Sequence, residues 1–262
     1  MRTPEEIKRD VRDHYTGVVN TATCCGPACG CAADFTFAES YAGREGYVAD
    51  ADLALGCGIP TDAAGIRPGQ TVVDLGSGAG NDCFVARQLV GDNGRVIGLD
   101  FTPAMIRKAQ ENAAKLGFTN VEFIRGEIEH MPLADGIADV IVSNCVLNLV
   151  PDKRMAFSEM LRVLKPGGRF AVSDTVTRGE VPVEVRDVAE LHAGCISGAI
   201  NRDDYLDLLK KVGFVDVEIR KEREQELSDE FLTSYLSPSQ VRSFRESGTS
   251  IASITVTGRK PS

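Results

Sequence analysis

Residues 71–80 decide the fold of this chain, and they read Thr-Val-Val-Asp-Leu-Gly-Ser-Gly-Ala-Gly. The first five are mostly β-branched and apolar residues, which is typical of a buried strand. The glycines that follow allow a tight turn and let the backbone approach a ligand without an intervening Cβ atom. Helical periodicity continues from about residue 81 to residue 90. The stretch therefore predicts a strand, a glycine-rich turn and a helix.

Strand-like and helix-like segments alternate beyond this stretch. Thr102-Pro103 provides an N-cap and a first helical residue, and Lys165-Pro166-Gly167-Gly168 is expected to close a later helix. This order predicts an α/β fold with a doubly wound, mostly parallel sheet, like that of Rossmann folds. The expected strands are 95–100, 121–124, 138–142 and 169–173, and the expected helices are 103–116 and 153–164.

The flanking regions differ from this centre in composition, and three parts are predicted: 1–69, 70–175 and 176–262. The first holds a short helix from about residue 5 to residue 15, followed by a cysteine-rich segment. The second holds the sheet. The third is a C-terminal α+β addition, in which a polar stretch near 221–240 is expected to be a solvated helix or a linker. The other elements expected there are helices near 183–193 and 202–212 and strands near 214–219 and 251–257.

Composition excludes several classes of protein. The chain has 262 residues, of which 43% are hydrophobic and 26% charged, as in globular proteins. Its formal net charge of −9 argues against nucleic acid as a partner. It has no run of about 18 apolar residues and no apolar N-terminal segment, so no membrane partner or secretion is expected. We expect a cytoplasmic protein whose eight cysteines are reduced, which favours metal binding or catalysis.

The residues around the glycine turn distinguish between two cofactors. A dinucleotide-binding fold places a third glycine where this chain has Asn81, and Asp74 before the turn would repel a pyrophosphate. The same carboxylate suits the ammonium group of S-adenosylmethionine. Asp100, at the end of the second strand, is placed to accept hydrogen bonds from the two ribose hydroxyls. Glu127 offers an acceptor for the adenine amine, and Ile128 offers an apolar wall for its ring.

Residues 70–175 resemble the class I S-adenosylmethionine-dependent methyltransferases, and the 164–168 turn looks like the one usual in that family. The resemblance implies the doubly wound fold and S-adenosylmethionine as the cofactor. The cofactor-binding residues that we carry over from it are Asp74, Gly76, Ser77, Gly78, Gly80, Asp100, Phe101, Glu127, Ile128 and Asn144.

Three thiols fall at places where such folds bind ligands. Cys83 lies in the first turn of a helix, whose positive end favours the thiolate. Cys145 follows the fourth strand at the carboxyl edge, and Cys195 ends a helix that can approach the same edge. A single buried cysteine is more often a small apolar residue than a ligand. Several thiols together suit a soft acceptor that keeps a lone pair, such as trivalent arsenic, whereas Cys57 lies between glycines and is expected to be structural.

Segments 80–83, 143–153 and 194–195 look like those of the arsenite methyltransferases, and the similarity covers roughly residues 5–220. Asn81 stands where that family often has arginine. The resemblance implies that Cys145 and Cys195 hold arsenite, or its thiol complexes, during methyl transfer. It further implies that Cys83 and one of Cys24 and Cys25 hold arsenic earlier or form a disulfide relay. The expected acceptors are arsenite and methylarsenite, and the expected reductant of the protein disulfide is thioredoxin or glutathione.

Other interpretations stay open. The thiols Cys24, Cys25, Cys29 and Cys31 suit arsenite capture, a redox relay or a structural zinc site. One rival function is a small-molecule C- or O-methyltransferase with His130 or His192 as its base, and another is a thiol-rich metalloid-binding protein without turnover. The sequence leaves open the number of methyl groups transferred, the use of antimonite and the oligomeric state.

Overall fold

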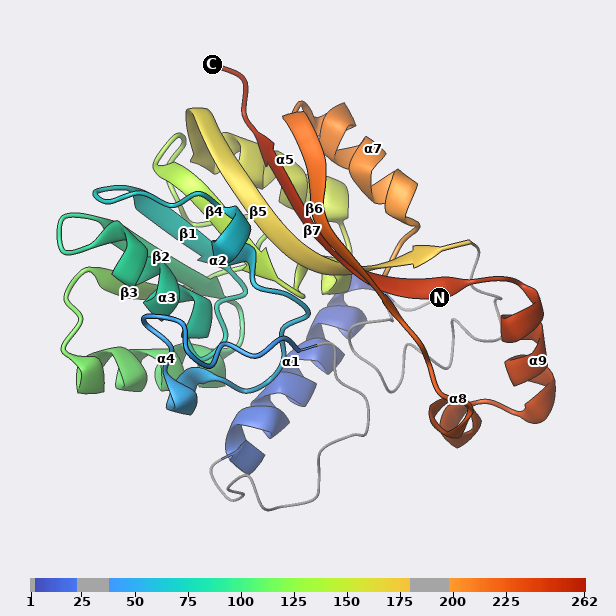
Figure 1. Cartoon of the computed structure of the whole chain (residues 1–262). Coiled ribbons are helices and arrows are strands. Elements are labelled where there is room, and N and C mark those ends of the chain that lie inside the picture. The colour runs from blue at the N-terminus through green and yellow to red at the C-terminus, as the bar shows by residue number, and fades with distance from the viewer. Residues whose placement is uncertain (1–2, 23–37, 180–197) are drawn as a thin grey trace.

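A seven-stranded sheet with the order β3-β2-β1-β4-β5-β7-β6 forms the centre of the molecule (Figure 1). The structure, a computed structural model, describes residues 3–22, 38–179 and 198–262. Strands β1 to β5 run parallel, and β7 lies antiparallel between β5 and β6. The strands are β1 (Thr71–Leu75), β2 (Arg95–Asp100), β3 (Val121–Arg125), β4 (Ala138–Asn144), β5 (Leu164–Arg178), β6 (Val215–Gln225) and β7 (Ser250–Arg259).

Helices cover both faces of this sheet because successive strand residues point to opposite sides. Val72 and Val96 belong to one apolar cluster, which includes residues of α3 and α4. Their neighbours Val73 and Ile97 belong to the other cluster, which includes residues of α5 and α7. The helices are α1 (Pro4–Ala22), α2 (Pro60–Ala63), α3 (Asn81–Val90), α4 (Pro103–Leu116), α5 (Lys153–Val163), α7 (Arg202–Val212), α8 (Asp229–Tyr235) and α9 (Pro238–Glu246), with 3-10 turns η1 (Ala49–Ala51) and η2 (Leu147–Leu149).

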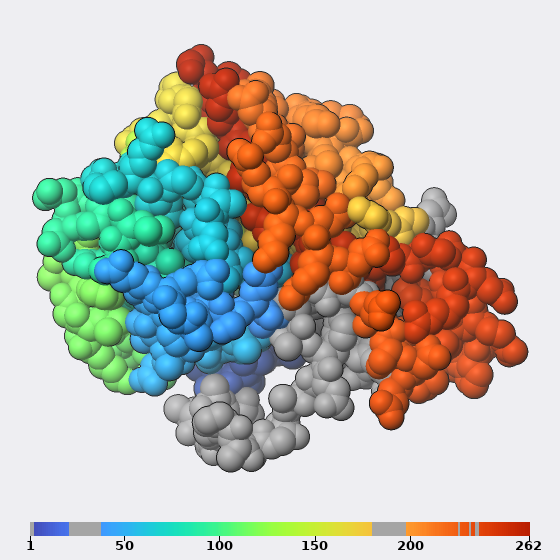
Figure 2. All heavy atoms as spheres, viewed as in Figure 1, coloured from blue at the N-terminus to red at the C-terminus, as the bar shows by residue number. Residues whose placement is uncertain are grey.

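The carboxyl ends of the parallel strands form the edge at which the functional residues gather. Strand order reverses between β1 and β4, and open α/β sheets bind ligands at such a point. Helix α1 lies along this edge and packs against α4 (Figure 1). Helices α8 and α9 project to one side of the molecule (Figures 1 and 2).

The predicted fold class is confirmed, since the sheet is mostly parallel with helices on both faces. Several limits differ from the prediction. Helix α1 extends to Ala22 rather than ending near residue 15, because its apolar residues continue at helical spacing to Val18 and Val19. The turn expected at 165–168 lies within β5, whose pairing with β4 shifts register there.

The polar stretch 221–240 is not a simple linker. Its first residues complete β6, and the rest contributes to α8 and α9. The expected cysteine-rich segment and the expected helix near 183–193 lie outside the described residues. The division into three parts stays a prediction, although β6 and β7 share one sheet with the parallel strands. In the described residues no helix combines the length and the apolar character needed to span a membrane.

Candidate functional site

A cavity opens at the carboxyl ends of β1, β2 and β4, where α1 also contributes to its wall. One predicted cofactor residue, Gly80, is not part of this wall. A Cβ atom at Gly80 would lie 2.8 Å from the Phe84 ring and 3.0 Å from the Phe123 ring, so this glycine makes room for aromatic packing. The predicted cofactor residues that line the cavity are Asp74, Gly76, Ser77, Gly78, Asp100, Phe101, Glu127, Ile128 and Asn144.

The glycine turn after β1 needs glycine for two reasons. Gly76 has φ +69°, in the left-handed region that side chains rarely adopt, and a Cβ atom there would lie 2.4 Å from Val146. Gly78 has φ +51°, and its amide donates to Oδ2 of Asp100 over 3.0 Å. Asp100 Oδ1 accepts a second hydrogen bond from the amide of Thr102 over 2.8 Å. These contacts fix the carboxylate at the end of β2 against the turn that follows β1.

The cavity has an excess of buried acidic groups. Burial raises the pKa of Asp74, and the neighbouring charge of Asp82 raises it further. Burial also raises the pKa of Asp82 to about 6, against hydrogen bonds from Tyr41 and Asn144 that lower it. For Asp100, burial raises the pKa although several backbone amides hydrogen-bond its carboxylate. A cationic ligand would stabilise the ionised form of all three acids.

Two further buried polar atoms belong to residues of the cavity wall. Ser77 Oγ and Asn81 Oδ1 are buried and have no hydrogen-bond partner among the described residues. Both residues line the cavity. Because buried polar atoms are rarely left without a hydrogen bond, these two suit a ligand that carries hydrogen-bonding groups.

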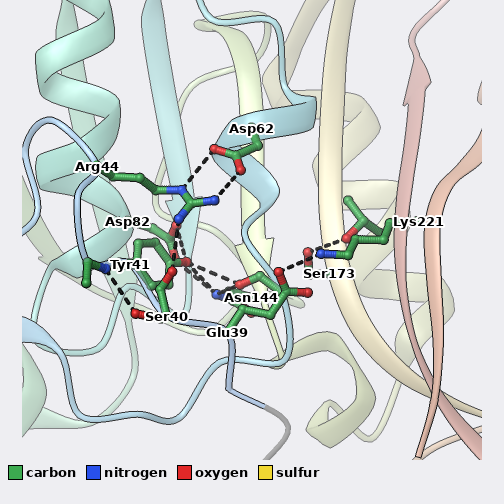
Figure 3. A network of polar contacts seen from close by, with 12 residues as sticks. Glu39, Ser40, Tyr41, Arg44, Asp62, Asp82, Asn144, Ser173 and Lys221 are labelled. Atoms are coloured by element: carbon green, nitrogen blue, oxygen red, sulfur yellow. Dashed lines mark hydrogen bonds and ion pairs between the residues drawn. The ribbon is translucent and has the colours of Figure 1, made fainter.

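A buried network connects the cavity to the loop that carries Cys57, and Figure 3 shows its members Tyr41, Asp82 and Asn144. The Tyr41 hydroxyl donates to the Asp82 carboxylate, 2.7 Å from Oδ1. Asn144 Nδ2 lies 2.8 Å from the Tyr41 hydroxyl and 2.8 Å from the carbonyl oxygen of Gly58. Asn144 Oδ1 accepts a hydrogen bond from the amide of Cys57 over 3.0 Å. The side chain at the end of β4 therefore holds loop 56–58 in place.

Cys145 lies on the wall of the same cavity, directly after β4. Its side chain is 2% exposed, and its Sγ lies 3.6 Å from Oγ1 of Thr175. Its backbone has φ +58°, which is strained for a residue with a side chain. The amide of Cys145 donates to the carbonyl oxygen of Ser173 over 2.7 Å, and this bond to β5 helps to hold the strained conformation.

Cys57 lies on a loop that contacts the end of β4, an arrangement that the sequence did not indicate, since its amide donates to Asn144, the residue before Cys145. Burial raises the pKa of the Tyr205 hydroxyl, and the charge of Asp174 raises it further. Smaller contributions come from both Cys57 and Cys145. The described structure thus brings loop 56–58 into contact with the end of β4 at the carboxyl edge.

Cys83 differs from expectation. The prediction that it is a thiolate is wrong, because the pKa of its thiol is raised well above the ordinary value. Burial is the largest cause, and the nearby charge of Asp74 adds to it. The Cys83 thiol donates to Oδ2 of Asp74 over 3.2 Å, so the carboxylate outweighs the positive end of α3. Cys83 also does not belong to the cavity wall.

Several predicted residues cannot be placed. Cys24, Cys25, Cys29, Cys31, Cys195 and His192 lie outside the described residues. The other candidate base, His130, is exposed and is not part of the cavity wall. Within the described ranges, no cluster of three or more His, Cys, Asp and Glu side chains is arranged to hold a metal ion.

Sequence reasoning missed Asp82, Tyr41 and the contribution of α1. Asp82 could have been found, because it is an acid in the first turn of the helix that follows the glycine loop. Tyr41 lies in a weakly patterned region, and nothing local in the sequence indicates its contact with a residue beyond the glycine turn.

Known proteins resemble this chain over most of its length. Residues 66–213 match the family described as methyltransferase domain. An arsenite methyltransferase of Halobacterium salinarum is 44% identical over 276 residues, which is 99% of this chain and 68% of the relative. An arsenite methyltransferase of Mus musculus is 35% identical over 228 residues, which is 81% of this chain and 59% of the relative.

Among solved structures, an arsenic (III) S-adenosylmethionine methyltransferase from Chlamydomonas reinhardtii superposes with a TM-score of 0.68 and 38% sequence identity. The match covers 79% of this chain and 68% of that structure. The chain therefore spans about two thirds of the length of the Halobacterium relative and of the algal structure, and 59% of the mouse relative.

Proposed function

The chain belongs to the arsenite methyltransferase family of class I S-adenosylmethionine-dependent enzymes, and we propose that it transfers methyl groups to trivalent arsenic held by its own thiols. One observation carries this proposal. Cys145 lines the same cavity as Asp74, Asp100 and the glycine turn, so a thiol and the predicted cofactor residues share one chamber. A soft metalloid bound to that sulfur would lie beside the methyl donor.

The cavity fits S-adenosylmethionine, which supplies an electrophilic methyl group on a sulfonium when it is bound. Its buried carboxylates at Asp74 and Asp82 suit the ammonium group of the cofactor. Asp100 suits the ribose hydroxyls, and Ser77 Oγ suits a further hydrogen bond. Ile128 is 7% exposed and offers an apolar surface for the adenine ring.

The thiols divide into two groups in this proposal. Cys145 and Cys195 hold arsenic during transfer, and Cys25 or Cys24 captures it earlier or relays a disulfide. Cys57 stays outside both groups as a structural residue of loop 56–58, because it does not line the cavity and its amide donates to Asn144. We assign Cys83 to the support of Asp74, since its thiol donates to that carboxylate.

The electrons balance with the protein's own thiols. Arsenic bound by two or three sulfurs keeps its lone pair, and no general base is needed because arsenic has no proton to lose. Bonding of that lone pair to the methyl carbon would break the carbon–sulfur bond of the sulfonium, release S-adenosylhomocysteine and make arsenic formally pentavalent. Two thiolates return two electrons to arsenic by forming a disulfide, which thioredoxin or glutathione then reduces. This leaves a trivalent methylarsenical as the product.

Paired serine variants test the proposal. In Cys145→Ser or Cys195→Ser, we expect methylation of arsenite and methylarsenite to fall by about 100-fold or more, because each variant removes a ligand of arsenic. Binding of S-adenosylmethionine, measured by calorimetry, should stay within about twofold of the unmodified protein. Turnover retained in both variants would refute the assignment of these thiols.

Cys83→Ser is the matched control, since it removes a buried thiol of the same size. We expect it to weaken cofactor binding through Asp74 and to keep turnover at saturating cofactor. A second measurement separates the rival functions. S-adenosylhomocysteine should form only when arsenite is present, whereas a C- or O-methyltransferase needs another acceptor and a binding protein forms none.

A further inference from the structure

Helix α1 presents three residues to the cavity that no motif indicated. Lys8, Val11 and Tyr15 all line the cavity, and their spacing of three and four residues places them on one side of the helix. Thr3 and Glu6 stabilise the start of this helix, because the Thr3 amide donates to the Glu6 carboxylate and the Glu6 amide donates to Thr3 Oγ1. Lys8, the first of the three residues, therefore lies about one turn after the stabilised start of the helix.

Lys8 connects this helix to the loop between β3 and β4. Its Nζ lies 2.6 Å from Glu127 Oε2 and 3.0 Å from Glu129 Oε1. The side chains of Lys8, Glu129 and Glu127 are 26%, 7% and 48% exposed, so the pair with Glu129 is largely shielded from water and the pair with Glu127 is not. Arg9 and Arg12 pair instead with their sequence neighbours, and all four of those side chains are more exposed than Lys8. The shielded pair should contribute more than a surface ion pair.

The positive charge of Lys8 distinguishes it from the other charged residues of the cavity wall. It is the only Lys or Arg among the described residues that line the cavity. The acids on the same wall are Asp52, Asp74, Asp82, Asp100, Glu127 and Glu129. Lys8 offsets part of the negative charge of Glu127 and Glu129, at the end assigned to adenine, and leaves Asp74 and Asp82 for a cationic group.

We propose that α1 is the cover of the cofactor site and that Lys8 is the positioning residue that holds it over the nucleoside. Val11 and Tyr15 supply the apolar surface of this cover, and the Lys8 ion pairs attach it to the acidic loop. The ligand under the cover is the adenosine part that S-adenosylmethionine and S-adenosylhomocysteine share. A cover that contacts this common part stabilises both complexes alike.

Binding of the two nucleosides without arsenic tests this proposal. In Lys8→Met we expect S-adenosylmethionine and S-adenosylhomocysteine to bind about 5- to 30-fold more weakly, mainly through faster dissociation. Lys8→Arg should restore most of the affinity, and the neighbouring Arg9→Met should change it by less than about twofold. Circular dichroism and the melting temperature check that each variant is folded.

The comparison of ligands separates a cover from a simple charge effect. S-adenosylmethionine carries one more positive charge than S-adenosylhomocysteine, so loss of a cation alone would strengthen its binding relative to the product. Unchanged affinity for S-adenosylhomocysteine in Lys8→Met, or tighter binding of S-adenosylmethionine alone, would overturn the proposal.

Hydrogen exchange gives a second readout that does not depend on a variant. Saturating S-adenosylhomocysteine should slow amide exchange in residues 4–22 of the unmodified protein. Equal exchange with and without the ligand would also overturn the proposal. Since no arsenic is present in these experiments, their failure is distinguishable from a failure of the thiol assignments.

Discussion

Asp174 is a buried acid whose pKa lies near neutral pH. It is 0% exposed within β5, and the Tyr205 hydroxyl donates to its Oδ2 over 3.1 Å. Burial raises its pKa to about 7, although the charge of Lys153 and the Tyr205 hydrogen bond act in the opposite direction. The adjacent residue, Thr175, contacts the sulfur of Cys145. Asp174 therefore gains and loses its proton close to the proposed arsenic site.

Stability should depend on pH through this residue. Its pKa is about 7 in the folded chain and about 3.9 in the unfolded chain, so the folded state binds more protons between these values. The stabilisation from that proton is complete below about pH 4 and is lost as the pH rises through 7. We expect the free energy of unfolding to fall by about 2 kcal/mol more in the unmodified protein than in Asp174→Asn between pH 5.5 and pH 8.

Urea unfolding at several pH values measures this difference. Tyr205→Phe provides a companion variant, because it removes a hydrogen bond that lowers the pKa of Asp174 and should move the loss of stability to higher pH. Parallel pH profiles for the unmodified protein and Asp174→Asn would contradict the expectation.

At the scale of helices and strands, the sequence predicted the elements with strong periodicity and missed those that depend on distant partners. Strand β1 was predictable because Val72 and Val73 face two different apolar clusters. Helix α7 was predictable to the residue, because Asn201 caps it and Gly213 ends it in a left-handed conformation. The pairing of β6 with β7 depends on contacts between distant segments, so its full length was not visible locally.

The residues of the site can be separated in the same way, into those that local spacing predicts and those that depend on distant partners. The glycine turn, Asp74 and Asp100 follow from local spacing because each lies at the end of a strand. The partners of Asp82 come from residue 41 and residue 144, and no spacing rule connects them. Cys83 was misjudged because the helix end was visible in the sequence, whereas the burial that raises its pKa was not.

An ion-pair cluster joins β5, β6 and α7. Glu222 lies 2.7 Å from Arg178 and 3.5 Å from Arg202, and its side chain is 20% exposed. We expect Glu222→Gln to reduce the free energy of unfolding by about 1 kcal/mol, because it leaves two arginines without their shared carboxylate. Glu218→Gln is the control. Glu218 pairs with Arg220 on the same strand, and each of these two side chains is 58% exposed. Equal losses in the two variants would show that burial does not decide the strength of these pairs.

For the whole molecule, the sheet is one unit that includes the C-terminal strands. Strand β7 pairs with β5 from Arg169 to Arg178, and Ile254 and Val256 belong to the same apolar cluster as the parallel strands. The matched methyltransferase segment ends at residue 213, before either β6 or β7 begins. The family segment therefore does not contain the whole sheet of this chain.

A truncated chain tests this dependence. We expect a fragment of residues 1–213 to aggregate, because its β5 would become an exposed edge strand and would lose apolar contacts. A fragment of residues 1–259 keeps all the strands and should elute as the full chain does in size-exclusion chromatography. A soluble, cooperatively unfolding 1–213 fragment would show that β6 and β7 are dispensable.

The left-handed backbone conformation at Cys145 is strained, whereas its thiol serves the proposed chemistry. Glycine would adopt φ +58° without strain, so the fold alone would favour glycine at this position. Cys145→Gly should then relieve the backbone strain, but it also loses the contacts of a side chain that is only 2% exposed and the sulfur on the cavity wall. The chain thus keeps a strained backbone conformation at the residue whose sulfur we propose as a ligand of arsenic.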